Sequence, residues 1–212
     1  MTMPVVFGAT YSVYVRVARL ALEEKGVPYR LEAIDIFADD GPPPGYHLRH
    51  PFLRIPAFEH DGFALYEAGA ITRYVDEAFD GPPLMPSTPQ ARARASQIAS
   101  ILDSYAYRCW VWDIYVESVE RSADEAKIAQ ALPRAETCLA AIEALIAPDG
   151  YFLGAAPCLA DLHAVQMIAH LRRAPQGAAL LARHPRWQTW WRRMSMRPSM
   201  AATRPPEEAA EG

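Results

Sequence analysis

The apolar positions at the start of the chain follow a strand pattern, then a helix pattern, then a strand pattern again. Residues 5–8 form a short apolar run typical of a buried strand. Apolar residues then recur at helical spacing over 13–25, with Ser12 as a favourable N-cap and Gly26 as the expected residue after the helix. Alternation over 29–33 predicts a second strand, so the order is that of a parallel βαβ unit.

A hairpin is predicted next. Asp61-Gly62 lies between two short strand patterns and is a pair favoured where a two-residue turn needs positive φ. Pro56 cannot donate to a strand ladder, so we expect it at a strand start or an edge. If the Ile55–Pro56 bond is cis, the backbone of Ile55 is turned outward, where it can pair with a peptide-like ligand.

Residues 39–51 are rich in Pro and Gly and predict an irregular loop before the hairpin, while 70–78 after it predict an amphipathic helix. Glu67 and Ala68 fall at the start of that helix, where backbone amides are available to an anion. Residues 1–80 therefore predict a small α/β domain with a site for a zwitterionic, peptide-like molecule.

The second half of the chain carries no strand pattern. Residues 81–89 contain four prolines and a glycine and predict a linker between domains. Helical spacing follows over 90–119, 126–147 and 159–171, and Pro185 opens a further helix. The residues predicted near one face of the first of these helices are Ala95, Ile98, Leu102, Tyr105, Cys109 and Trp112.

The end of the chain completes this all-helical domain, which we assign to residues 90–212. Arg197-Pro198 is predicted to end the last helix, and residues 203–212 are predicted to form a polar, frayed tail.

Composition excludes several classes of protein. The formal net charge of −4 gives no general attraction to nucleic acid or to an anionic membrane. The chain has no long uninterrupted apolar run, so we expect neither a membrane span nor a signal peptide. Cys109, Cys138 and Cys158 are widely spaced without a metal-binding pattern, which predicts buried thiols in a reducing cytoplasm and no metal site.

Three groups of motifs, in this order, resemble the soluble glutathione S-transferases, in a serine-type, bacterial-like cytosolic class. They are Ser12 with Arg16 before Leu20-Ala21-Leu22; Ile55-Pro56-Ala57 with Glu67-Ala68; and Tyr151-Phe152-Leu153-Gly154 with Cys158-Leu159-Ala160-Asp161-Leu162. The resemblance covers nearly the whole chain. It implies a thioredoxin-like N-terminal domain that binds glutathione and an all-α C-terminal domain that contributes the electrophile pocket.

The chain departs from the family pattern at three positions. One is Arg54, where the family often has Gln or Lys. The family usually has Ser or Thr after the acid at the helix start, but this chain has Ala68, which offers only its backbone N–H. Cys158 stands where the family usually has a Ser or Thr that forms a capping box with the Asp three residues later, and Asp161 can still cap from its side.

Ser12 is the first candidate for catalysis. A free thiol has a pKa of about 8.5, so glutathione needs a hydroxyl donor and a helix N-terminus to ionise near neutral pH. Ser12 combines both features, although it is alternatively a plain N-cap. Tyr11 and Tyr14 are rival donors, and Arg16 either raises the local positive potential or forms a structural ion pair.

The resemblance implies further contacts to glutathione. Glu67 would bind the γ-glutamyl ammonium, and alternatively it is only a favourable charge at a helix N-terminus. Ile55 would pair through its backbone with the cysteinyl unit. The residues predicted to bind glutathione are Tyr11, His50, Arg54, Ile55, Pro56, Glu67 and Ala68. For Arg54 and His50 the alternative is an ordinary structural or surface role.

The second substrate would be an electrophile held by the helical domain. The residues predicted to line its pocket are Tyr14, Tyr105, Arg108 and Trp112, and for each the alternative is a place in the core.

The predicted function is conjugation of glutathione, as co-substrate, to a small hydrophobic electrophile, in detoxification and by a cytoplasmic homodimer. The alternatives are a glutathione-dependent isomerase or peroxidase, or a non-catalytic ligand-binding protein on the same fold. Neither nucleic acid nor a membrane is expected as a partner.

Overall fold

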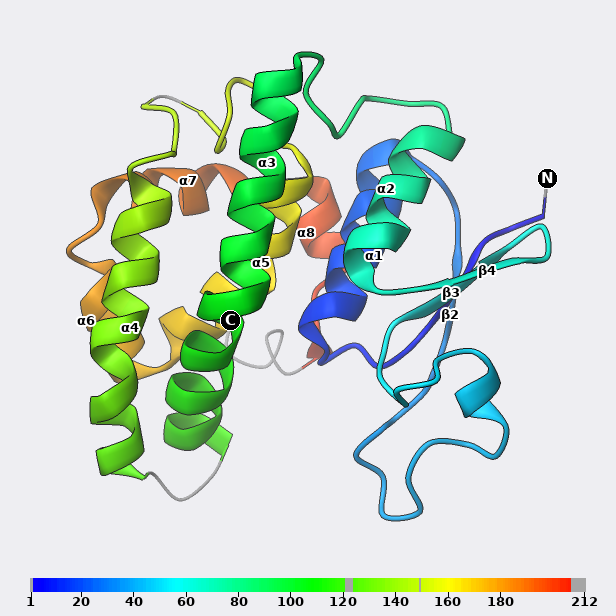
Figure 1. Ribbon diagram of the computed structural model, residues 1–212, viewed down its shortest axis with the longest axis horizontal. Coiled ribbons are helices and arrows are strands. Elements are labelled where there is room, and N and C mark those ends of the chain that lie inside the picture. The colour runs from blue at the N-terminus through cyan, green and yellow to red at the C-terminus, as the bar shows by residue number, and fades with distance from the viewer. Residues whose placement is uncertain (1, 121–123, 149, 207–212) are drawn as a thin grey trace. The chain divides into compact units, whose positions relative to one another are not determined.

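The computed structural model describes residues 2–120, 124–148 and 150–206, and these form two compact units (Figure 1). The first unit contains Met1–Leu84 together with the chain from Arg197 onward, and the second contains Met85–Met196. The sequence prediction placed residues 197–206 with the helical half, whereas the structure groups them with the first unit.

A four-stranded sheet forms the centre of the first unit. Its strands are β1 (Val5–Phe7), β2 (Arg30–Glu32), β3 (Ala57–His60) and β4 (Phe63–Tyr66), in the order β2-β1-β3-β4. β1 pairs with β2 in parallel, as the βαβ pattern predicted, and with β3 antiparallel, and β3 and β4 form the hairpin. The predicted α/β class is confirmed for this unit.

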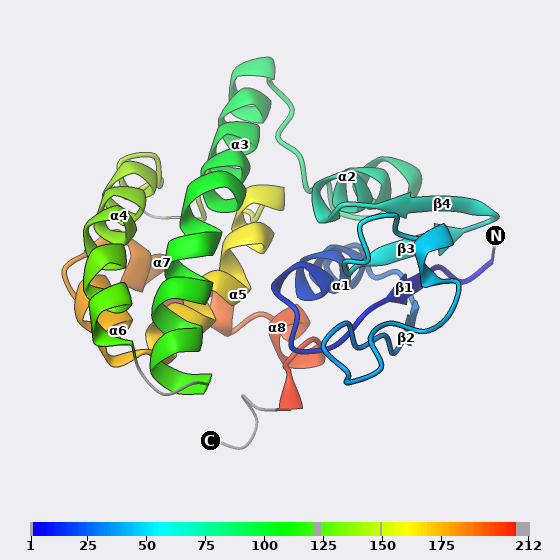
Figure 2. The same ribbon diagram turned by 60° about the horizontal axis from the view of Figure 1, so that its bottom comes forward.

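Two helices pack on this sheet, α1 (Val13–Lys25) and α2 (Ala68–Ala78), and they also pack against each other (Figure 2). The register places Val6 opposite Phe58, and both side chains are buried. The 3₁₀ helix η1 (Tyr46–Leu48) interrupts the irregular segment between β2 and β3.

The turn chemistry of this unit follows the sequence prediction. Asp61 and Gly62 have φ of 49° and 78°, which confirms the hairpin turn. Gly26 ends α1 with φ of 68° and donates its backbone N–H to the carbonyls of the last turn. The Ile55–Pro56 peptide bond is cis, and Pro56 immediately precedes β3, as predicted for a residue that cannot donate to the ladder.

The second unit is helical in its described residues. Its elements are α3 (Pro89–Ile101), η2 (Leu102–Ala106), η3 (Arg108–Glu120), α4 (Glu125–Glu143), α5 (Leu159–Arg173), α6 (Pro175–Leu181) and α7 (Pro185–Ser195). Among the described residues, no helix is both long enough and apolar enough to cross a membrane. Cys109, Cys138 and Cys158 are all buried as free thiols, as predicted.

The long helix of this unit changes its geometry after Ile101. η2 and η3 are π-helical, and the Tyr107 N–H donates to the Leu102 carbonyl five residues earlier. This pairing rotates later residues relative to an α-helix, so the predicted face is only partly buried beyond Leu102: Cys109 is buried, whereas Tyr105 is not. Tyr105 is 67% exposed, whereas Ala106 and Trp110 are buried.

The helix predicted over 126–147 is α4, which begins after the N-cap Asp124 and contains Pro133. Two other features differ from the prediction. The short helix α6 was not predicted. Pro198 opens a further helix, α8 (Pro198–Ala202), and Thr203 after it is fully buried rather than frayed. The rest of the predicted tail from residue 207 lies outside the described residues.

Asp161 in the first turn of α5 organises the core of the second unit. One carboxylate oxygen accepts from the backbone N–H of Phe152 at 2.8 Å and from Trp190 Nε1 at 2.7 Å, and the other accepts from the N–H of Cys158 at 2.8 Å. The ring of Phe152 stacks on that of Trp190. The capping role that the sequence assigned to Asp161 is confirmed.

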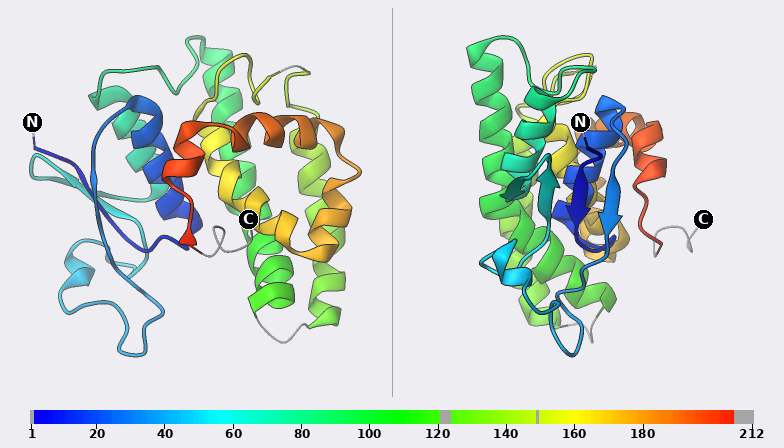
Figure 3. Two further views of the ribbon diagram at one scale, coloured as in Figure 1. Left: turned by 180° about the vertical axis from the view of Figure 1, so that it is seen from behind. Right: turned by 90° about the vertical axis from the view of Figure 1, so that its right-hand side faces the viewer.

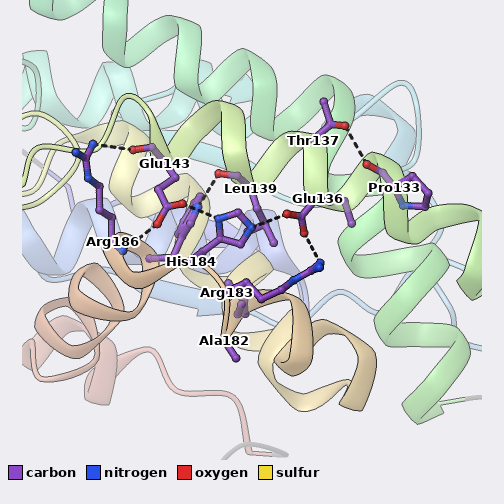
Figure 4. A network of polar contacts seen from close by, with 12 residues as sticks. Pro133, Glu136, Thr137, Leu139, Glu143, Ala182, Arg183, His184 and Arg186 are labelled. Atoms are coloured by element: carbon purple, nitrogen blue, oxygen red, sulfur yellow. Dashed lines mark hydrogen bonds and ion pairs between the residues drawn. The ribbon is translucent and has the colours of Figure 1, made fainter.

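A second polar network joins α4 to the turn between α6 and α7 (Figure 4). His184 lies between two glutamates of α4, with Nδ1 2.6 Å from Glu143 and Nε2 3.3 Å from Glu136. Arg183 donates to Glu136 at 2.6 Å, and the backbone N–H of Arg186 donates to Glu143 at 2.9 Å. These contacts fix the α6–α7 turn against α4.

Candidate functional site

Three loops leave the sheet of the first unit at the same end. Phe7, the last residue of β1, is paired with Ala57 of β3, and Ala57 is paired with Tyr66, the last residue of β4. The loops that carry Ser12, Ile55-Pro56 and Glu67 therefore begin or end at neighbouring positions. α1 and α2 both start at this end, so two positive helix termini face the same region.

Ser12 is the N-cap of α1, as predicted. Its Oγ accepts a long hydrogen bond of 3.4 Å from the backbone N–H of Val15. A hydroxyl that accepts such a bond still carries a hydrogen that it can donate. The capping role and the role of a thiolate donor are therefore compatible in one side chain, and the two alternatives of the sequence analysis do not exclude each other.

Tyr11 is less suited to activate a thiol. Its hydroxyl donates to Asp35 at 2.7 Å, and its ring packs against Phe37 with centroids 5.9 Å apart. Burial, followed by the hydrogen bond to Asp35, raises the pKa of the Tyr11 phenol well above its usual value. The same hydrogen bond lowers the pKa of Asp35. Tyr14 lies in the first turn of α1 and is half-buried.

Ile55 lies against the loop that carries Ser12, because Gly8 has no side chain. A Cβ on Gly8 would overlap Val15 Cγ2 and would lie 3.2 Å from Ile55 Cβ. Gly8 therefore permits the close approach of Ile55 to the start of α1. From the sequence, Gly8 is expected only as the end of a strand, although a glycine between a strand and a helix is a usable signal of close backbone packing.

Glu67 adopts an unusual backbone conformation at the start of α2. It is the N-cap, with φ of 71° and ψ of 118°, and its side chain makes no capping hydrogen bond. A non-glycine residue held in such a conformation costs about 1–3 kcal/mol, and such residues cluster at ligand sites. The first amides of α2 and the Glu67 carboxylate are therefore available to a ligand, while the side chain of Ala68 is buried.

His50 is buried, and its Nδ1 has no hydrogen-bond partner among the described residues. Its ring lies beside Tyr66, with centroids 4.9 Å apart. Burial lowers the pKa of His50, whereas the charge of Glu67 raises it and that of Arg54 lowers it. The carbonyl of Arg54 accepts from the Tyr46 hydroxyl at 2.8 Å, and burial raises the pKa of Tyr46 to about 12.

The residues predicted for the electrophile lie on different elements. Tyr14 is on α1 of the first unit, whereas Tyr105, Arg108 and Trp112 are on η2 and η3 of the second. Arg108 donates through Nε to Asp113 at 2.9 Å, so its guanidinium is part of an ion pair. The assignment of these four residues to the electrophile pocket stays a prediction.

A separate cavity of about 740 Å³ lies on the sheet of the first unit, between the strands and the segment 43–49. Four charged residues line this cavity. Arg30 pairs with Glu32 and Arg49 pairs with Glu59, so their charges cancel. The Arg49 guanidinium also lies over the Phe7 ring at 4.1 Å. This cavity is distinct from the edge formed by Ser12, Ile55 and Glu67.

Comparison with known proteins identifies the family. The glutathione S-transferase N-terminal domain matches residues 6–83, and the glutathione S-transferase C-terminal domain matches residues 124–193. The chain is 30% identical over 159 residues to maleylacetoacetate isomerase of Pseudomonas aeruginosa, covering 71% of this chain and 73% of that protein. The chain belongs to the glutathione S-transferase family.

A second relative agrees with this assignment, and a solved structure shows the same fold. Glutathione S-transferase 4 of Zea mays is 29% identical over 199 residues, which cover 92% of this chain and 88% of that protein. The crystal structure of poplar glutathione transferase F1 superposes with a TM-score of 0.85 at 22% identity, covering 100% of both chains. The resemblance to the soluble glutathione S-transferases, and the fold class that it implied, are therefore confirmed.

Proposed function

We propose that this glutathione S-transferase binds glutathione at the sheet edge of its first unit and conjugates it to a small hydrophobic electrophile. The observation that carries the proposal is the meeting of the α1 and α2 N-termini with the cis Ile55–Pro56 loop at one end of the sheet. Glutathione is a zwitterionic peptide, and this edge offers it backbone amides, a carboxylate and a hydroxyl.

Each group has a role in this proposal. Ser12 donates to the glutathione thiolate, and the N-terminus of α1 adds positive potential. Ile55 pairs with the cysteinyl backbone. The Glu67 carboxylate binds the γ-glutamyl ammonium, and the Ala68 amide holds the γ-glutamyl carboxylate. His50 Nδ1 and Arg54 contact the glycyl carboxylate.

The remaining assignments complete the proposal. Residues 1–80 form the glutathione-binding domain, residues 81–89 the linker and residues 90–196 the source of the electrophile pocket. Tyr11 contributes its ring rather than its hydroxyl, and Pro56 holds the loop. Tyr14, Tyr105, Arg108 and Trp112 contact the electrophile. The protein acts as a homodimer in the cytoplasm, in detoxification, with glutathione as its co-substrate and without a metal.

A glutathione-dependent isomerase is the second candidate. It is favoured by the 30% identity to a protein named maleylacetoacetate isomerase. Both reactions need the same thiolate. In conjugation the new carbon–sulfur bond remains, and an aryl halide loses its halide ion. In isomerisation the thiolate adds to the double bond, the resulting single bond rotates, and expulsion of the thiolate re-forms the double bond in the trans arrangement.

Two experiments test these proposals in sequence. Retention on immobilised glutathione, with elution by free glutathione, is expected; a protein that passes through unretained contradicts both candidates. Product analysis with aryl halides, an unsaturated cis-diacid and an organic peroxide then selects the reaction. A glutathione conjugate supports the first candidate, a trans-isomer without loss of glutathione supports the second, and glutathione disulfide indicates a peroxidase.

A further inference from the structure

The chain from Arg197 to Arg204 lies along α1 of the first unit, although nearly two hundred residues separate it from that helix in sequence (Figure 3). α8 and the residues beside it contact the face of α1 that carries Arg16, Arg19 and Glu24. We call Arg197–Arg204 the C-terminal clamp.

One end of the clamp holds Glu24 near the C-terminus of α1. Arg197 donates to both oxygens of Glu24, one of them through Nε at 2.6 Å, and Ser199 Oγ donates to the same carboxylate at 2.5 Å. The Glu24 side chain is only 6% exposed. A bidentate pair of this kind fixes orientation as well as distance.

The other end of the clamp holds two arginines in the first half of α1. Arg16 donates through Nε to Thr203 Oγ1 at 3.3 Å and through Nη2 to the Met200 carbonyl at 3.2 Å. Arg19 donates to the carbonyls of Ala202 and Thr203 at 3.1 and 3.3 Å. Cations at the last carbonyls of α8 are favourably placed, because those carbonyls lack partners within the helix.

These contacts extend to Ser12. The backbone N–H of Arg16 donates to the Ser12 carbonyl at 3.0 Å, as the first bond of α1. Arg16 and Glu24 are eight positions apart, which corresponds to about 12 Å along a helix. Contacts at both ends of that length restrict sliding and rotation of α1, and therefore the position of the Ser12 hydroxyl.

The burial of the arginines argues that the clamp does more than add stability. Arg16 and Arg19 are 1% and 8% exposed, and moving a guanidinium out of water is costly, so apolar side chains would often stabilise such a contact equally well. Directional hydrogen bonds, unlike apolar contacts, define one position. Small displacements of a catalytic group have large effects on rate.

We propose that the C-terminal clamp is a positioning element of the thiolate site, acting through α1 on Ser12. This inference rests on the proposed function, because it assumes that Ser12 donates to the bound glutathione thiolate. Arg197, Ser199 and Thr203 are positioning residues, since they touch α1 and not the reacting sulfur.

The test compares Arg197→Met with Arg183→Met. Thiolate absorbance is measured at saturating glutathione, and kcat and KM are measured over a range of glutathione concentrations. Arg183 donates to Glu136 at 2.6 Å in the second unit, so the control removes a similar ion pair outside the clamp. We expect Arg197→Met to lower the thiolate absorbance of bound glutathione at neutral pH and to lower kcat about three- to tenfold, with KM for glutathione changed less than twofold. Arg183→Met should leave all three values unchanged.

Two further variants keep the test decisive. Thr203→Val retains the shape of the side chain and removes the acceptor of Arg16. It should give the same loss of thiolate and kcat, and it replaces Arg197→Met in the test if that variant does not fold. The exchange Glu24→Arg with Arg197→Glu should recover at least half of the lost thiolate. Unchanged thiolate and kcat in a folded Arg197→Met or Thr203→Val variant, or an equal loss in Arg183→Met, would overturn the inference. A wild-type protein that binds glutathione without ionising it would instead contradict the role of Ser12.

Discussion

Three helix N-termini in this protein have the same backbone chemistry but are satisfied in different ways. At α5, Asp161 accepts from the backbone N–H of the N-cap Cys158 and from two N–H groups outside the helix, and it is completely buried. At α1, Ser12 accepts one bond of 3.4 Å, and at α2, Glu67 makes no side-chain cap. A helix N-terminus is available to a ligand only where its own chain does not satisfy it.

The comparison separates stability from binding. The α5 terminus should govern the free energy of unfolding, whereas the α1 and α2 termini should govern glutathione binding and turnover. A change at the α5 terminus that weakened glutathione binding in the folded protein, or a change at Ser12 or Glu67 that left turnover and binding as they were, would contradict this comparison.

The largest effect is expected for Asp161→Ala. The change leaves the N–H groups of Phe152, Cys158 and Trp190 without their buried acceptor, and each such group costs about 1–3 kcal/mol. The free energy of unfolding, measured by urea denaturation, should fall by about 3–5 kcal/mol. Trp190→Phe, which removes one donor and keeps a ring, should cost less. An Asp161→Ala protein as stable as the wild type would contradict the structural role of this terminus.

The next largest effect is expected for Ser12→Ala on turnover. Removing one donor to an anion in an active site lowers kcat by about 10²-fold. Thr88→Ala is the matched control, because Thr88 caps α3 by accepting from the Ala91 N–H at 3.3 Å. Both variants should lose about 1 kcal/mol of stability, but only Ser12→Ala should lose activity in steady-state assays. Equal rates in the two variants would remove Ser12 from catalysis.

Glu67→Gln should weaken glutathione binding with little change in stability. The substitution keeps the shape of the side chain but removes the charge that binds an ammonium, which is worth about 1.5–3 kcal/mol. Calorimetric titration should therefore show at least a tenfold higher Kd. Glu77→Gln on the same helix, which pairs with Arg73 at 2.9 Å on the surface, is the control and should bind normally.

Gly8→Ala and Gly177→Ala compare a steric clash beside the proposed glutathione site with a steric clash elsewhere in the protein. The added Cβ would overlap Val15 at Gly8 and the Leu171 carbonyl at Gly177. Each should cost about 1–3 kcal/mol of stability. Because only Gly8 lies against Ile55, only Gly8→Ala should weaken glutathione binding, and a loss in both variants would show that binding follows stability.

The smallest expected effect is the contribution of His50 to the pH dependence of stability. Burial lowers its folded pKa below the ordinary value of 6.5, so the native state binds fewer protons than the unfolded state in that range. The stability contributed by neutral His50 is fully present above pH 6.5 and is lost as the pH falls from 6.5 through the lower folded pKa. Thermal denaturation across this range should show a shallower loss in His50→Gln than in the wild type, and identical slopes would contradict the pKa shift.

The sequence predicted the features that local chemistry determines. Asp61-Gly62 and Gly26 were placed correctly because few residues adopt positive φ, and Ser12 and Asp161 because caps have local signatures. The π-helical geometry after Ile101 exposed Tyr105 and overrode the 3.6-residue pattern.

The return of the C-terminus to the first unit was also missed. Thr203 is buried by α1, an element encoded far away in the sequence, and a short polar stretch carries no local signal of such a contact. The contacts that join distant segments are tertiary, so no periodic pattern reports them.

Amide hydrogen exchange with and without glutathione tests the central claim most directly. We predict slower exchange at the N–H of Ile55 and at the first amides of α2 when glutathione is added, with unchanged exchange at the α5 terminus around Asp161. Protection that spares Ile55 and α2, or that appears only in the second unit, would contradict the assignment of the glutathione site to this sheet edge.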